Sequence, residues 1–375
     1  MNIPVYDYTL ILLMGVSRSG KTTFARKHFF DYEINETDEP DLTKSLQVMD
    51  GNWLDGDKRR EVLRKAKYAN YLRIGIVFDL DEETLFGHGI TPDSKYRSEV
   101  QIANSLKRRL KEEGFDQTYF LNSDEEIDSV IVERRKPVFD RKQEKGPFDI
   151  IGDVHGCLPE LEKLIRKLGY KKENDSYYHP DNRKLVFVGD IVDRGPDSMG
   201  VLRLIMKLCS QNAALMVLGN HDDRLLRYLK GNKVEVKHGL ETTAEELRNV
   251  SEEEKQEIMS FLENIPTYYV LDDGNLIAVH AGIKESYVGK YTKKIREFCL
   301  YGLTTGEISE IGIPVRLDWA KDYKGETLIV YGHTPRLAVY RQNNAICVDT
   351  GCVFMNRLSA LRYPEMTVVD VRKKK

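Results

Sequence analysis

The chain has 375 residues, of which 41% are hydrophobic and 31% are charged, and its formal net charge is -3. This length predicts two domains of unequal size, and the composition excludes a fibrous, disordered or membrane-spanning protein. The charge excludes the strongly basic surface of a protein that coats nucleic acid, although a strand end could still be bound through its phosphate.

The cysteines and the N-terminal segment indicate a cytoplasmic protein. The five cysteines are odd in number and include no CxxC pair, which fits reduced thiols better than a disulfide framework. The apolar run near the N-terminus lacks the basic leader and the cleavage site of a signal peptide, and no segment approaches the roughly 20 apolar residues of a membrane span. We therefore expect a cytoplasmic protein that has no membrane partner.

The first predicted element is a buried strand over residues 9–14, which a glycine-containing turn and a helix follow. Further strands are predicted near 46–49, 74–80 and 119–121, and an amphipathic helix is predicted over 99–113. Strands that alternate with helices are typical of an α/β domain.

The turn after the first strand has the sequence GVSRSGKT, which fits the P-loop pattern GxxxxGK[ST]. Backbone N–H groups of such a turn hold phosphates, Lys21 would reach the β- and γ-phosphates, and Thr22 would hold magnesium. The sequence therefore predicts a site for ATP and Mg²⁺ at the following residues: Gly15, Ser17, Ser19, Gly20, Lys21, Thr22 and Thr23.

A charged stretch with two prolines lies between Val132 and Pro147 and has no apolar period. Such a composition is typical of a linker between domains. We place the boundary near Gly146, with one domain at 1–145 and the other at 147–375.

The second half contains three predicted strands that each enter a Gly-Asp or Gly-Asn turn, and two later stretches also carry a histidine beside a glycine. Five polar clusters at strand ends have no joint explanation as core packing, because buried polar groups without partners are costly. The polar residues of these clusters are Asp153, His155, Asp190, Asn220, His221, His280 and His333.

These residue types indicate a metal site. Imidazole, carboxylate and amide ligands suit Mn²⁺, iron, nickel or zinc better than calcium, and we expect two divalent ions with Mn²⁺ as the first candidate. Two ions that share a bridging carboxylate would hold a hydroxide and bind two oxygens of a phosphoryl group. The sequence therefore predicts a metal-dependent phosphoesterase.

The five clusters resemble the calcineurin-type binuclear metallophosphoesterase superfamily, which implies a four-layered α/β sandwich. The resemblance implies His221 as the residue that protonates or stabilises the leaving group, Asp193 as the residue that orients its imidazole, and Arg194 as a ligand of the phosphate oxygens. It also implies six metal ligands: Asp153 and His155 for one ion, Asn220, His280 and His333 for the other, and Asp190 as the bridge.

Asp349 lies at another predicted strand end, where it could position His333 or the substrate, or simply form a turn. Two further positions weaken a serine/threonine protein phosphatase interpretation. Such phosphatases usually carry Arg and Glu where this chain has Leu218 and Asp222.

A P-loop domain followed by a metallophosphoesterase resembles the bacterial polynucleotide kinase-phosphatases. The resemblance implies removal of a 3′-terminal or 2′,3′-cyclic phosphate and ATP-dependent phosphorylation of a 5′-hydroxyl. The implied partners are RNA or DNA ends, and a separate ligase is conceivable on family grounds. That family has a general base beyond the P-loop helix, where Asp38 is the candidate, although Asp38 also lies in an acidic run that could simply be solvated.

Two departures from the pattern of that family weaken the prediction of kinase activity. The segment that binds the acceptor is shorter than in that family, and the lid stretch 87–97 offers only Lys95 and Arg97 over the phosphates. The domain could instead be a nucleotide-binding regulator. The stretch 230–243 also resembles bis(5′-nucleosyl)-tetraphosphatases, so such a hydrolase with an accessory nucleotide-binding domain is the alternative function.

Overall fold

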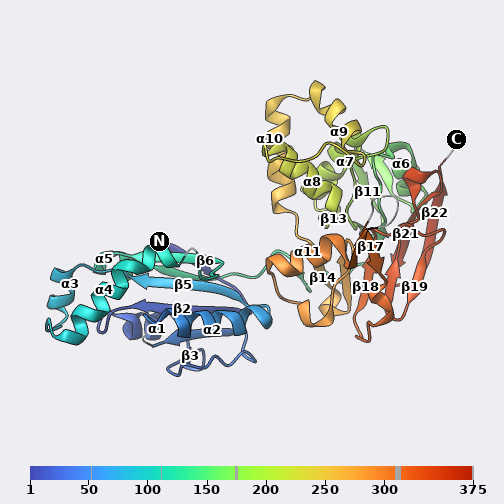
Figure 1. The fold of residues 1–375 in the computed structure, drawn as a ribbon. Helices are drawn as coiled ribbons and strands as arrows, with labels where there is room; N and C mark the ends of the chain where they lie inside the picture. Colours follow the sequence, from blue (N-terminus) through green and yellow to red (C-terminus); the bar gives the residue numbers. More distant parts are fainter. Residues whose placement is uncertain (52, 111, 174–175, 309–313, 374–375) are drawn as a thin grey trace. The chain divides into compact units, whose positions relative to one another are not determined.

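The computed structural model describes residues 1–51, 53–110, 112–173, 176–308 and 314–373. The chain forms two compact units, each of which is drawn in Figure 1. The first unit comprises Met1–Pro137 and Gly289–Lys294, and the second comprises Val138–Val288 and Ile295–Lys375.

The first unit contains a five-stranded sheet in which all neighbouring strands are parallel. Its strands, in spatial order, are β3 (Ile34–Asn35), β4 (Leu46–Asp50), β2 (Thr9–Gly15), β5 (Leu72–Phe78) and β6 (Gln117–Leu121). The central strand β2 is buried along its whole length, as its uninterrupted apolar sequence predicts.

Helices cover both faces of this sheet. Phe24 and Ala25 of α1 pack on one face, and Val62 of α2 and Leu106 of α4 pack on the other. Asp93 caps α4 by accepting a hydrogen bond from the Tyr96 N–H, so this helix begins earlier than the predicted 99–113. The helices are α1 (Lys21–His28), α2 (Gly56–Tyr68), α3 (Glu82–Gly87), α4 (Ser94–Arg109) and α5 (Asp124–Ser129).

The stretch that we expected to be a linker is largely structured. β7 (Ile131–Arg134) pairs with β1 (Asn2–Val5) in the first unit, and β8 (Asp140–Arg141) pairs with β14 (Tyr268–Leu271) in the second. Phe139 is buried in the second unit. The N-terminal segment of the first unit therefore ends at Pro137, earlier than the boundary we expected near Gly146, because an apolar side chain and a strand of the second unit lie inside the charged stretch.

The second unit contains two large sheets. The five-stranded sheet has, in spatial order, β13 (Ala214–Met216), β12 (Lys184–Phe187), β9 (Phe148–Ile151), β21 (Arg357–Tyr363) and β22 (Thr367–Arg372). The six-stranded sheet has β19 (Tyr340–Gln342), β20 (Ala345–Cys347), β18 (Leu328–Tyr331), β15 (Leu276–Val279), β14 and β8. Two hairpins add β10 (Lys171–Glu173) with β11 (Ser176–Tyr178), and β16 (Leu303–Ile308) with β17 (Pro314–Leu317).

The two large sheets pack face to face. Ile150 and Val186 of the five-stranded sheet share one apolar core with Ala278 and Val330 of the six-stranded sheet. Alternate residues of the same strands point the other way, which gives each sheet a second apolar face that helices cover.

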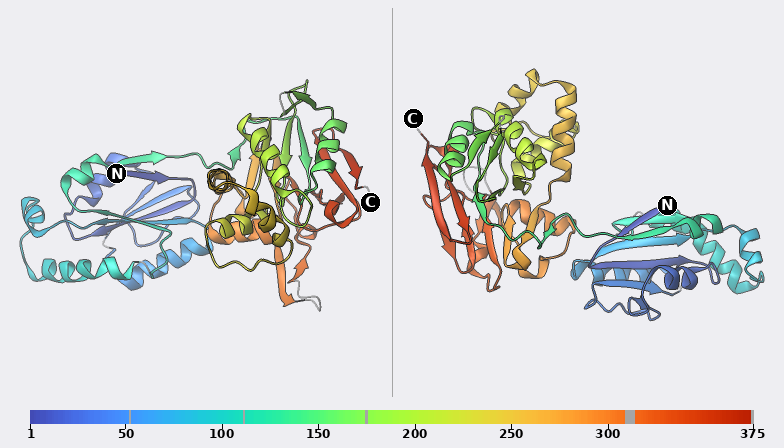
Figure 2. Two further views of the ribbon diagram at one scale, coloured as in Figure 1. Left: turned by 90° about the horizontal axis from the view of Figure 1, so that it is seen from above. Right: turned by 180° about the vertical axis from the view of Figure 1, so that it is seen from behind.

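The outer faces carry the helical layers, which can be followed in Figures 1 and 2. Leu161 and Leu202 belong to the core under the five-stranded sheet, and Phe298 belongs to the core on the six-stranded sheet. The unit is therefore the four-layered α/β sandwich that we expected. Its helices are α6 (Leu158–Lys167), α7 (Ser198–Ser210), α8 (Asn220–Leu229), α9 (Leu240–Glu246), α10 (Glu252–Asn264) and α11 (Lys293–Tyr301).

Among the residues that the structure describes, we find no helix with the length and apolar character needed to cross a membrane.

Candidate active site

The predicted metal ligands lie at the ends of parallel strands in both sheets of the second unit. β9, β12 and β13 are parallel neighbours, and so are β15, β18 and β20. The carboxyl ends of parallel strands meet at one edge of a sheet, where ligands of α/β proteins commonly bind. All six predicted ligands are buried there: Asp153, His155, Asp190, Asn220, His280 and His333.

Three of these residues have a backbone conformation that side chains other than glycine seldom adopt. His155, Asp190 and His333 have φ values of 45°, 49° and 70°. Such left-handed conformations cost about 1–3 kcal/mol each and are found mainly at functional sites. Gly219 allows a close approach, because a Cβ there would collide with the backbone nitrogen and carboxylate of Asp190.

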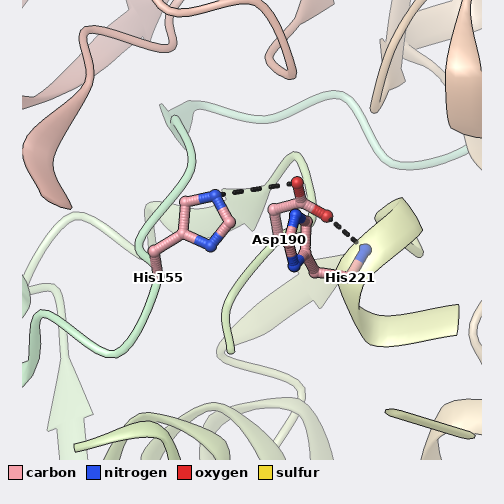
Figure 3. A group of neighbouring side chains, drawn as sticks. All are labelled: His155, Asp190 and His221. Carbon is pink, nitrogen blue, oxygen red and sulfur yellow. Dashed lines mark hydrogen bonds and ion pairs between the residues drawn. The ribbon is translucent and has the colours of Figure 1, made fainter. Parts of the chain in front are cut away.

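Asp190 lies between His155 and His221, as Figure 3 shows. The His155 Nε2 is 3.8 Å from the Asp190 Oδ2, and the His221 backbone N–H donates to the Asp190 Oδ1 at 2.8 Å. The other ring nitrogen of His155 is held by the carbonyl of Val192 at 2.8 Å. That contact turns the Nε2 toward the carboxylate.

The same aspartate faces a second group of side chains. The His280 Nε2 lies 3.4 Å from the Asp190 Oδ2, 3.0 Å from the Asn220 Oδ1 and 2.9 Å from the His333 Nδ1. The Val188 carbonyl holds the His280 Nδ1 at 2.8 Å. The buried His333 Nε2 has no hydrogen-bond partner in the described part of the chain.

These two groups fit divalent cations. Within the described residues, ligand atoms less than 4.8 Å apart form the triads His155–Asp190–His221 and Asp190–His280–His333. Burial lowers the pKa of His155 to about 3 and also lowers the pKa of His333, so both rings are neutral, as a metal ligand must be. Ring nitrogens that converge on a shared carboxylate are a donor set for first-row transition metals.

Asp153 is placed differently from the other predicted ligands. Its carboxylate accepts a hydrogen bond from the His333 backbone N–H at 3.0 Å, and it belongs to neither triad of described residues. Burial, and then the nearby carboxylates of Asp349 and Asp190, raise the pKa of Asp153. Several buried carboxylates at one place favour a bound positive charge, since such charges are costly to bury alone.

The predicted acid and its orienting residue are in contact. The His221 Nδ1 lies 2.6 Å from the Asp193 Oδ2, and the Thr243 hydroxyl donates to the Asp193 Oδ1 at 2.6 Å. Asp193 is fully buried. This chain of contacts fixes the imidazole so that its Nε2 is the nitrogen left for a ligand.

Arg194 reaches the same place from the neighbouring turn. Its Nη1 lies 3.0 Å from the His155 Nε2, and its guanidinium stands over the Phe354 ring at 5.3 Å. A guanidinium beside the candidate metal ligands is placed to meet phosphate oxygens, which bind well to its fork geometry.

Two residues near the site were not predicted to act there. Asp222 was considered only as a departure from the protein phosphatases, yet its carboxylate accepts hydrogen bonds from the backbone N–H groups of Asp190, Ile191 and Gly219 at 2.8–3.0 Å. Its position in the first turn of α8 is the signal that could have identified it. Arg316 of β17 donates to the His333 carbonyl at 3.1 Å, and no sequence pattern marks it.

Asp349, for which two roles were open, accepts a hydrogen bond from the Gly351 N–H at 2.9 Å. This is the contact expected of a turn-forming aspartate. Its carboxylate also lies close enough to act on Asp153, as the pKa of Asp153 indicates.

In the first unit, the turn between β2 and α1 contains two residues with left-handed backbone conformations. Arg18 and Gly20 have φ values of 61° and 89°, and Gly20 lies at the start of α1. Turns in which backbone N–H groups converge at a helix start bind phosphates. The Lys21 ammonium donates to the carbonyls of Gly15 and Val16 at 2.9 and 2.7 Å, and burial lowers the pKa of Lys21.

An acidic side chain contacts this loop. Glu99 of α4 accepts hydrogen bonds from the Ser17 N–H at 2.7 Å and from the Ser17 hydroxyl at 3.0 Å. Asp38, the predicted general base, is instead exposed and paired with Lys58 at 2.6 Å. The described cleft around the loop is lined by other acidic residues, Glu36 and Asp50, and Asp38 is not among its lining residues.

Comparisons with known proteins agree with the site in the second unit. The family model described as calcineurin-like phosphoesterase matches residues 146–363 and leaves 1–145 outside the match. A bis(5′-nucleosyl)-tetraphosphatase PrpE of Anoxybacillus flavithermus, named as asymmetrical, is 51% identical over 228 residues, which are 60% of this chain and 93% of that protein. The proteins of the same name from Oceanobacillus iheyensis and Bacillus subtilis are 50% and 46% identical, over 60% of this chain and 91% and 93% of theirs.

The family match covers more than half of the chain and includes all six predicted ligands. Residues 146–363 also include every strand of the two large sheets except the edge strands β22 and β8, together with both triads. The chain therefore belongs to the calcineurin-like phosphoesterase family.

Proposed function

We propose that this protein hydrolyses bis(5′-nucleosyl) tetraphosphates asymmetrically. The observation that supports this activity is the pair of buried donor triads on Asp190, in a unit that spans more than nine tenths of relatives with that name. This proposal reverses our preference from the sequence, which put nucleic-acid end healing first. The names of the relatives favour the alternative, and they lend no support to a kinase-phosphatase.

In the proposed reaction, a water oxygen forms a bond to one phosphorus of the four-phosphate chain while a bridging P–O bond breaks. The products are a nucleoside monophosphate and a nucleoside triphosphate. Bound divalent ions, for which we propose Mn²⁺, would supply charge neutralisation and a more acidic water.

The side chains of this protein have separate tasks in that reaction. Arg194, which lies beside His155, and Arg316, which lies beside His333, would bind non-bridging phosphate oxygens. The His221 Nε2 would stabilise the charge on the leaving oxygen by a hydrogen bond, and Asp193 would keep the ring turned toward it. Each task uses a contact that is already present.

The first unit has a second proposed role, the binding of ATP with Mg²⁺. Its support is the left-handed turn at Arg18 and Gly20 in front of α1, with Lys21 folded onto it. We do not extend the proposal to a 5′-kinase, because Asp38 pairs with Lys58 outside the cleft. Binding of ATP without transfer of its γ-phosphate is the behaviour of a regulatory domain.

The test offers the purified full chain with Mn²⁺ three separate substrates: diadenosine tetraphosphate, a 3′-phosphorylated oligonucleotide and a phosphopeptide. We expect the tetraphosphate to have the highest kcat/KM and to yield ATP and AMP in equal amounts by ion-exchange chromatography. ADP as the sole product would contradict asymmetrical cleavage. A higher kcat/KM for the oligonucleotide would instead support nucleic-acid end healing as the function.

A further inference from the structure

A cleft opens beside His333. The cleft encloses about 70 Å³ of free space, which is smaller than most ligand pockets, so a ligand larger than a phosphate group must extend along its open side. The residues that give it chemical character are Tyr301, Arg316, Asp318, Trp319, His333 and Arg336. They come from the end of α11, from β17 and the turn after it, and from the end of β18.

Two guanidinium groups line this cleft. Arg316 marks its inner end, because it donates to the His333 carbonyl at 3.1 Å. The Arg336 Nη2 lies 3.8 Å from the Asp318 Oδ2, and its guanidinium stands 4.8 Å over the Tyr340 ring. The Arg336 Nε is buried and has no hydrogen-bond partner among the described residues. The group is thus held in place, and because 36% of its side chain is exposed, its terminal nitrogens can still reach an anion.

Two aromatic residues of the cleft, Trp319 and Tyr301, differ in how far their contacts restrain the ring. The Trp319 indole N–H donates to the Ala281 carbonyl at 2.8 Å, which fixes that ring in the wall. The Tyr301 side chain is 38% exposed at the end of α11. An exposed ring beside two arginines is suited to stacking on a nucleobase.

We infer that this cleft binds the triphosphate half of the substrate, with Arg336 on the phosphates beyond the reacting phosphorus and Tyr301 on the second base. The inference rests on the proposed function, since unequal cleavage requires that three phosphates and a nucleoside extend to one side of the reacting atom. The cleft is lined by a candidate metal ligand and by two arginines and is open to solvent, so the phosphates can lie along it and the nucleoside at its open side. Asp318 does not oppose the anion strongly, because Arg336 is its partner.

Arg336→Ala tests the phosphate contact. We expect the KM for diadenosine tetraphosphate to rise about tenfold or more, because a charge-assisted hydrogen bond to the phosphates is lost. The KM for 4-nitrophenyl phosphate should change much less. Arg341→Ala is the matched control, because Arg341 is an exposed arginine of β19 that is not a lining residue of the cleft. Equal changes for both substrates in Arg336→Ala would overturn the inference.

Tyr301→Ala and Tyr301→Phe test the base contact. Stacking predicts that the alanine variant raises the KM for the tetraphosphate by about tenfold, whereas the phenylalanine variant retains the wild-type value. An equal loss in both variants would mean that the hydroxyl, rather than the ring, matters, and would overturn this part of the inference.

Inhibition by ATP separates this inference from the proposed function. ATP should inhibit hydrolysis of 4-nitrophenyl phosphate competitively, with an inhibition constant that rises about tenfold in Arg336→Ala, while inhibition by inorganic phosphate changes little. If the wild type fails to hydrolyse the tetraphosphate but ATP inhibition still depends on Arg336, the cleft is a triphosphate site and the proposed substrate is wrong. An inhibition constant for ATP that is equal in the wild type and in Arg336→Ala would overturn the inference that the cleft binds a triphosphate.

Discussion

The carboxylate of Asp222 holds the backbone of Asp190, accepting its N–H at 2.8 Å. Both residues are buried, and the Ile191 N–H is held by the other Asp222 oxygen at 3.0 Å. The shared aspartate of the two triads therefore keeps its position through a carboxylate that belongs to neither triad. This contact gives the first prediction.

Asp222→Ala should weaken metal binding and fold stability together. It leaves buried N–H groups of the Asp190 turn without a partner, which costs about 1–3 kcal/mol for each group. Thermal unfolding and Mn²⁺ titration of the variant measure the two effects. Asp223→Ala, on the next residue of α8, is the control for a general effect on that helix, and wild-type Mn²⁺ affinity in Asp222→Ala would contradict the positioning role.

Asp190→Ala should abolish hydrolysis of 4-nitrophenyl phosphate, because both triads lose their common carboxylate. Metal analysis of the purified variant should show less bound metal than the wild type. Nucleotide binding by the first unit should persist, since that unit has its own sheet and core. Near-normal hydrolysis with Mn²⁺ would show that the ligand assignment is wrong.

His221→Ala should lose about 10²–10⁴-fold in rate on an alkyl phosphate, whose leaving group needs a proton. The loss should be much smaller on 4-nitrophenyl phosphate and on diadenosine tetraphosphate, whose leaving groups are stable as anions. The comparison of kcat for the three substrates checks this. Equal losses on all three would instead assign His221 to metal or substrate binding, which its place in one triad also permits.

Lys21→Ala should abolish ATP binding to the full chain, measured by calorimetry with Mg²⁺, because the ammonium that faces the loop carbonyls is lost. Hydrolysis of 4-nitrophenyl phosphate without ATP should equal that of the wild type. If ATP regulates the phosphoesterase, its effect on the rate should disappear in this variant.

Glu99→Gln should raise the affinity for ATP. The carboxylate takes up the Ser17 N–H, and its negative charge opposes a phosphate at the same loop. Removal of that charge favours the nucleotide, and calorimetry should give a Kd lower by several-fold. Glu83→Gln, an exposed residue of α3, is the charge-matched control. An unchanged or higher Kd in Glu99→Gln would mean that Glu99 assists nucleotide binding.

The sequence predicted the parts of the site that local patterns determine. Asp190, His221 and His333 follow apolar strands and glycines, so their place at a strand end could be read along the chain. The partners of Glu99 and Arg316 could not be predicted in this way. Ser17 and Glu99 are 82 residues apart, and the irregular hairpin that carries Arg316 has no periodic pattern.

The linker was misjudged for a related reason. Its charged residues dominate the composition, but one side chain, Phe139, lies in the core beside Tyr268, with ring centroids 4.5 Å apart. A single apolar residue in a charged stretch produces no period, and only the tertiary fold shows where it packs.

The candidate ligands are divided between the two sheets: Asp190 and Asn220 follow strands of one, and His280 and His333 follow strands of the other. An ion held by both sets would join the two halves of the sandwich, and its affinity would become part of the folding equilibrium. At a free concentration 100 times its Kd, such an ion adds about 2.7 kcal/mol to the free energy of unfolding. Chelation should therefore lower the melting temperature of the second unit as a whole. Removal of the metal would then denature this enzyme at temperatures at which the metal-bound form stays folded.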